Sequence, residues 1–140
     1  MSIDMNRCWF IDVDGTIMEH QSDFRLLDAL FNKEWRLDNI LPGVAHLWEQ
    51  IPEQDYIVIT TARPSFFRYM TEKALKSHGL RFDYILMDLP SGPRILVNDT
   101  KPEEEGGMET AYAIPVERNK GLVWENFRKF FGSKGTDSVQ

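Results

Sequence analysis

The sequence predicts an α/β domain with a mainly parallel sheet of about five strands and helices on both faces. Short apolar runs alternate with segments of helical periodicity along most of the 140 residues. The run at 56–59 is almost fully apolar, as expected for a strand that is covered on both sides. This length and an apolar fraction of 42% suffice for one core. We therefore expect a single domain over 1–132 and a flexible tail at 133–140.

The first predicted strand covers residues 8–13, where apolar residues lead into Asp12 and Asp14. A carboxylate at the end of a buried strand is costly unless it is paired or bound to a metal. An Asp-x-Asp pattern alone is a weak signal that most often marks an exposed polar segment. The apolar run before it, and Gly15 and Thr16 directly after it, favour a phosphoryl-transfer site.

Two helices are predicted between the first and second strands. Apolar residues recur at helical spacing over 23–32 and again over 44–51, the second time behind a turn at Pro42. A third helix is expected over about 64–78, since Pro64 suits the first turn of a helix and a glycine at position 79 suits its end.

The second half of the chain predicts three more strands, at 82–87, 95–97 and 111–116. The acidic segment between the last two, 100–110, is expected to be a solvated loop. A closing helix is predicted from Leu122 to Phe131, where it would bury several aromatic side chains.

Polar residues follow three of these strands at the point where each strand ends. Asp12 ends the first strand, Thr61 and Arg63 follow the second, and Asn98 and Asp99 follow the run at 95–97. Ligands of open parallel sheets bind beyond the carboxyl ends of the strands. Each group alone has an ordinary explanation as a cap or a turn, but their coincidence at one sheet edge indicates a shared site.

Metal-assisted phosphoryl transfer is the chemistry that joins these groups. Asp12 would attack phosphorus and form an aspartyl-phosphate, and Asp14 would protonate the leaving oxygen and then activate water. Mg²⁺ prefers oxygen ligands, which Asp12, the backbone carbonyl of Asp14 and Asp99 would supply. Thr61 and nearby backbone N–H groups would hold the phosphate oxygens.

These motifs resemble those of the haloacid dehalogenase superfamily of phosphatases. Its first motif is similar to residues 12–16, its second to 57–61 and its fourth to 95–99, so the resemblance spans about residues 8–116. It implies a three-layer, Rossmann-like fold for the single domain. The gaps between the motifs are too short for a folded cap, so the chain resembles a capless member. The Thr-Ala-Arg run is similar to a Thr-Gly-Arg variant of the second motif, which assigns phosphate binding to Thr61.

Two departures from the family pattern bear on the site. Asn98 stands where many members carry Asp; Asp99 alone would still suffice for Mg²⁺, with Asn98 on a metal-bound water. The lysine that steadies the phosphate is not evident, and Lys101 and Lys76 remain alternatives, with Arg63 sharing the role. Asp14 favours phosphate-ester hydrolysis over carbon–halogen cleavage, because the family's dehalogenases lack this second acid.

The resulting hypothesis is a Mg²⁺-dependent phosphatase that acts on a small metabolite such as a sugar phosphate. A nucleotide or polynucleotide-end phosphatase and a non-catalytic binding protein remain as alternatives. A net charge of −6 argues against binding to long nucleic acids, which require a basic surface. We expect a cytoplasmic protein without membrane association, since no segment looks like a signal peptide or a membrane span. An open site also makes a homo-oligomer reasonable. Cys8, the single cysteine, is expected to be buried.

Overall fold

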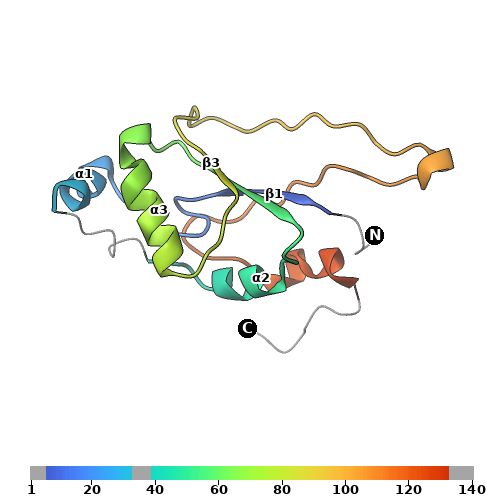
Figure 1. The fold of residues 1–140 in the computed structure, drawn as a ribbon, viewed down its shortest axis with the longest axis horizontal. Helices are drawn as coiled ribbons and strands as arrows, with labels where there is room; N and C mark the ends of the chain where they lie inside the picture. Colours follow the sequence, from blue (N-terminus) through green and yellow to red (C-terminus); the bar gives the residue numbers. More distant parts are fainter. Residues whose placement is uncertain (1–5, 33–38, 133–140) are drawn as a thin grey trace.

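The computed structural model describes residues 6–32 and 39–132, so the tail expected at 133–140 lies outside the described residues. The chain forms an α/β domain whose helices and strands alternate over its first two thirds (Figure 1). In chain order the elements are β1 (Cys8–Asp12), α1 (Asp23–Asn32), α2 (Val44–Gln50), β2 (Tyr56–Thr60), the 3₁₀ turn η2 (Ser65–Phe67), α3 (Arg68–Ser77), β3 (Tyr84–Leu86), and the 3₁₀ turns η3 (Glu103–Glu105), η4 (Trp124–Asn126) and η5 (Arg128–Phe130).

The sheet of the described residues has three parallel strands in the order β1-β2-β3. In its register Asp12 lies opposite Thr60, and Thr60 lies opposite Leu86. The carboxyl ends of all three strands therefore meet at one edge, as the sequence predicts. At the other end, the buried Asp55 accepts hydrogen bonds from the Arg7 backbone (3.1 Å) and the Trp9 indole (2.9 Å), and these bonds hold β1 to the start of β2.

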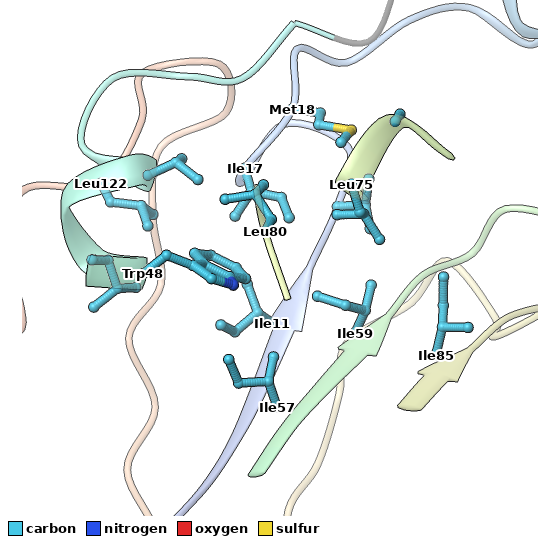
Figure 2. Packing of buried hydrophobic residues seen from close by; sticks show 14 of the residues in the cluster. Ile11, Ile17, Met18, Trp48, Ile57, Ile59, Leu75, Leu80, Ile85 and Leu122 are labelled. Carbon is cyan, nitrogen blue, oxygen red and sulfur yellow. The ribbon is translucent and has the colours of Figure 1, made fainter. Parts of the chain in front are cut away.

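One face of this sheet carries the core (Figure 2). Successive side chains of a strand point to opposite faces of the sheet. Those that point to the core face are buried: Ile11, Ile57, Ile59 and Ile85. The buried apolar residues of α2 and α3 belong to the same cluster. α2 lies in the connection from β1 to β2, and α3 lies in the connection from β2 to β3, so both connections cross the sheet in the same direction. Since such crossovers are nearly always right-handed, they place their helices on the same face.

In the part of the chain that the structure describes, the opposite face of the sheet is largely exposed apart from Val58 and Thr60 of the central strand, so the prediction of helices on both faces is not borne out there. Four large apolar or aromatic side chains on it are accessible: Phe10 (58% exposed), Tyr56 (49%), Tyr84 (54%) and Leu86 (40%). Cys8 lies on this face and is exposed as well, contrary to expectation. The domain described here therefore has two layers rather than three.

Residues 90–116 form an extended arm that runs away from the body to η3 and back (Figure 1). The strands expected at 95–97 and 111–116 are not formed, which reduces the sheet from the predicted five strands to three in the described part of the chain. The two limbs of the arm are joined by hydrogen bonds from the Asn98 side chain to the Thr110 carbonyl (3.0 Å) and from the Lys101 backbone to the Met108 carbonyl (2.9 Å).

The C-terminal aromatic residues close the core as expected, but as two 3₁₀ turns, η4 and η5, in place of an α-helix. Phe127, Phe130 and Phe131 are buried there. The ring of Phe131 stacks on Trp9 of β1, with 5.9 Å between centroids and 10° between planes. Within residues 6–32 and 39–132, no helix is both long enough and apolar enough to cross a membrane.

Candidate active site

A tight loop after β1 presents the two acidic residues of the first motif. The carbonyl of Val13 accepts hydrogen bonds from the backbone N–H groups of Thr16 (3.1 Å), Ile17 (3.0 Å) and Met18 (3.0 Å). Gly15 has a φ of 84°, a conformation that favours glycine. Apolar packing against the core fixes the loop, because three of its side chains are fully buried: Val13, Ile17 and Met18. This anchoring holds Asp12 and Asp14 at the carboxyl edge of the sheet.

Asp12 is held by two side chains. The hydroxyl of Thr16 donates a hydrogen bond to its Oδ2 at 2.9 Å, and Nη2 of Arg94 lies 3.3 Å from its Oδ1. Burial raises the pKa of Asp12 above its ordinary value of 3.8 and is the largest influence on it. The Thr16 hydrogen bond and the charge of Arg94 lower this pKa, whereas the charge of Asp14 raises it. A third of the Asp12 side chain (34%) stays accessible to a ligand.

Asp14 forms a bidentate ion pair with Arg63. Nη2 of Arg63 donates to Oδ1 of Asp14 at 2.7 Å, and Nε donates to Oδ2 at 3.0 Å. The Arg63 side chain is almost fully buried (2% exposed), and its Nη1 donates to the Thr71 hydroxyl at 2.9 Å. The second residue expected to bind phosphate is therefore turned toward a carboxylate and toward α3. Arg63 locks the loop after β1 to the end of β2.

The expected phosphate-binding hydroxyl, that of Thr61, is fully buried. Its Oγ1 accepts a hydrogen bond from the Arg63 backbone at 3.0 Å, which shapes the turn after β2. Thr60, not Thr61, lies directly opposite Asp12 in the sheet register. The phosphate-binding role of Thr61 stays a prediction.

Asn98 and Asp99 are not brought to Asp12 within this chain, which corrects the predicted metal site. Both lie on the arm, where Asn98 bonds to the Thr110 carbonyl and the hydroxyl of Thr110 donates to the Asp99 carbonyl. The described residues include no group of three potential metal-ligating His, Cys, Asp or Glu side chains. The reason is geometric, because the chain passes Asp12 already at Arg94 and then leaves the body.

The lysine candidates also lie elsewhere. Lys101 belongs to the arm, and the ammonium of Lys76 lies over the Phe82 ring, 6.0 Å from its centroid. Arg94 is the cation that reaches Asp12, a contact that the sequence analysis did not anticipate. A useful signal is its position directly before a short apolar run that only eight residues, 87–94, separate from β3.

Comparisons with known proteins do not identify a family for this chain. No family model matches it, and no curated protein matches it. A crystal structure of an MCSG target from Vibrio cholerae aligns with 21% identity over 75% of this chain and 90% of that chain, at a TM-score of 0.39. A likeness this weak supports no conclusion about function.

Proposed function

We propose that this protein is a phosphomonoester hydrolase that works through an aspartyl-phosphate on Asp12. The observation that carries the proposal is the position of this carboxylate at the carboxyl edge of a parallel sheet, with Arg94 at 3.3 Å and Asp14 two residues on. Ligands of such sheets bind at this edge. A partly accessible carboxylate beside a cation matches what attack on a phosphate ester requires.

The proposed reaction has two steps. An Oδ atom of Asp12 forms a bond to phosphorus while the ester P–O bond breaks, and Asp14 gives a proton to the leaving alkoxide. Water then attacks the acyl-phosphate, Asp14 takes its proton, and inorganic phosphate leaves with Asp12 regenerated. Positioned proton transfer of this kind contributes about 10²–10⁴-fold to the rate.

Arg94 supports the proposal electrostatically. Attack by one anion on another requires positive charge at the site, and the buried Arg63 already serves Asp14. The Arg94 side chain is 42% exposed, so it is free to contact a phosphate oxygen as well. Mg²⁺ would supply further charge neutralisation, but the carboxylates that one chain gathers here do not amount to a magnesium site. We therefore derive no step through the metal from this chain alone.

The substrate class follows from the resemblance and from the absence of a cap in the sequence. A small metabolite such as a sugar phosphate is the first choice, and nucleotides or polynucleotide ends are the second. One observation favours a non-catalytic binding protein as an alternative: Asp14 is fully engaged by Arg63, whereas a general acid–base must exchange protons with the substrate.

The test is hydrolysis of an activated aryl phosphate by the purified chain with Mg²⁺, compared with the same assay in excess chelator. We expect turnover with Mg²⁺ that falls at least about 100-fold in Asp12→Asn. Glu53→Gln, an exposed acid in the turn before β2, serves as the matched control and should retain activity. Panels of sugar phosphates, nucleotides and 3′-phosphorylated oligonucleotides then rank the substrate classes. Equal rates for Asp12→Asn and the unaltered protein would refute the proposal.

A further inference from the structure

We propose that two copies of this chain exchange arms, so that the partner's arm pairs with the free edge of β1 and places the partner's Asp99 beside Asp12. The carboxylate that a single chain fails to bring to its own site would then arrive from the second copy. The exchange of arms stands on the fold alone. The role of the partner's Asp99 in the site rests on the proposed function.

The connection after β3 is too short to return the arm to its own sheet. Eight residues, 87–94, separate β3 from the apolar run at 95–97. A crossover between parallel strands needs about a dozen residues or more. To start beside Cys8, this connection would have to travel back along the sheet by about 16 Å and across three strand spacings, about 14 Å. The straight line between these points is about 21 Å, and the fully extended reach of eight residues is about 27 Å, which leaves only about 6 Å for the path over the side chains of the sheet.

The position of Arg94 shows where the eight residues go instead. Arg94 reaches Asp12 at the carboxyl edge of the sheet. A parallel strand that carries Asp99 to this edge must begin at the opposite edge. Because the chain is already at Asp12 five residues before Asp99, it continues outward, and the arm projects into solvent (Figure 1).

The arm carries an apolar strand sequence that no other described part of its own chain covers. Ile95 is 87% exposed, Leu96 56% and Val97 89%. β1 ends the strand order of the described sheet, and Phe10 on its outward face is 58% exposed. An unpaired strand edge is a template for another chain, and a β-rich apolar run is a suitable occupant. Exchange of the arm between two copies would pair the edge of β1 and cover the apolar run in the same contact.

The exposed area is large enough for a stable dimer. The chain exposes 9141 Å², whereas a compact monomer of 16.3 kDa is expected to expose about 7,500 Å². A standard interface buries about 800 Å² on each partner, which is about half of this excess. The occupant that fits is therefore a second copy with the same arm and the same open edge.

The first test is the oligomeric state of the full chain, measured by light scattering after size-exclusion chromatography. We expect a dimer, or a multiple of it, that Val97→Asp converts to a folded monomer. Phe31→Asp is the control matched in exposure, since Phe31 is 81% exposed but lies on α1, and it should leave the dimer intact. A monomeric unaltered chain, or a dimer that survives Val97→Asp and Ile95→Asp, would overturn the exchange. Circular dichroism of each variant shows that it is folded.

The second test asks whether the site is shared between copies. Asp12→Asn and Asp99→Asn chains are each expected to be inactive, and co-expression should restore activity, because half of the mixed dimers' sites combine an intact Asp12 with an intact partner's Asp99. Random pairing predicts about one quarter of the unaltered activity. Active unaltered protein with no restoration would overturn the shared site. If the unaltered protein itself is inactive, the proposed function fails while the size measurement still decides the exchange.

Discussion

Arg63 and Asp14, which are 49 residues apart in the sequence, form a bidentate ion pair whose shortest contact is 2.7 Å. It joins the loop after β1 to the end of β2, and the arginine side chain is 2% exposed. The pair thus sets the position of the second acid of the candidate site. The same ion pair also contributes to the stability of the fold.

Replacement of Arg63 is expected to destabilise the protein. Removing one partner of a buried pair leaves the other charge without compensation, which costs about 3–5 kcal/mol, and the partial exposure of Asp14 puts Arg63→Ala near the lower end. Arg68→Ala removes an exposed pair with Glu72 and should cost about 0.5 kcal/mol. Urea unfolding of both variants measures the difference. Equal losses in the two variants would contradict a structural role for Arg63.

The backbone approach at Gly43 predicts a second stability effect. Gly43 has a φ of 81°, and a Cβ there would lie 2.1 Å from the Leu122 carbonyl oxygen. Gly79 has a similar φ of 72° but open space around it. Gly79→Ala should therefore cost about 1–2 kcal/mol through φ alone. Gly43→Ala should cost at least about 3 kcal/mol, because it adds a steric clash. Thermal or urea unfolding compares them, and similar losses would show that the close approach is absent.

The raised pKa of Asp12 predicts how stability depends on pH. Burial disfavours the charged carboxylate in the folded state, so the folded protein holds this proton more tightly than the unfolded chain. The contribution of Asp12 to stability is therefore fully present below its unfolded pKa. It is lost as pH rises through the higher folded pKa. Asp12→Asn removes this loss, so its stability relative to the unaltered protein should rise as pH increases from below the unfolded pKa of Asp12 to above its folded pKa. Urea unfolding in chelator measures this, and a constant difference would contradict it.

Arg94 should affect the pKa of the same carboxylate. Its charge lowers the pKa of Asp12, so Arg94→Gln should raise that pKa further, as followed by carboxyl NMR titration. Lys73→Gln on α3, where Lys73 lies over the Tyr69 ring, is the control that keeps the same charge change away from the site. An Asp12 titration that is identical in both variants would show that the Arg94 contact does not persist in solution.

The strands and helices of the first 86 residues were predictable because each has a local cause. β1 and β2 are short apolar runs that end in polar residues, and the prolines and glycines near their ends mark the turns. The carboxyl edge of the sheet was predicted for the same reason. The run at 95–97 shows the limit of this reasoning. An apolar strand sequence predicts that the strand will be covered. It does not predict which strand will cover it, or whether that strand belongs to the same chain.

The placement of Asp12 and Asp14 at the carboxyl edge of the sheet was predictable, whereas the positions of Asp99 and of the cations were not. Asp12 and Asp14 follow directly from the strand and turn pattern. The partners of these acids depend on where distant segments pass in space, and neither pairing has a local signature. Arg63 was expected to hold phosphate and is paired with Asp14 instead. Arg94 was not among the expected site residues and lies at Asp12.

The central claim is that Asp12 becomes phosphorylated, and trapping this intermediate tests it most directly. The protein is mixed with a ³²P-labelled phosphate ester and Mg²⁺, quenched in acid, and mapped by peptide mass spectrometry. Label is expected on the peptide that contains Asp12, and none is expected in Asp12→Asn. Substrate turnover with label on another residue, or with none on Asp12, would contradict the account.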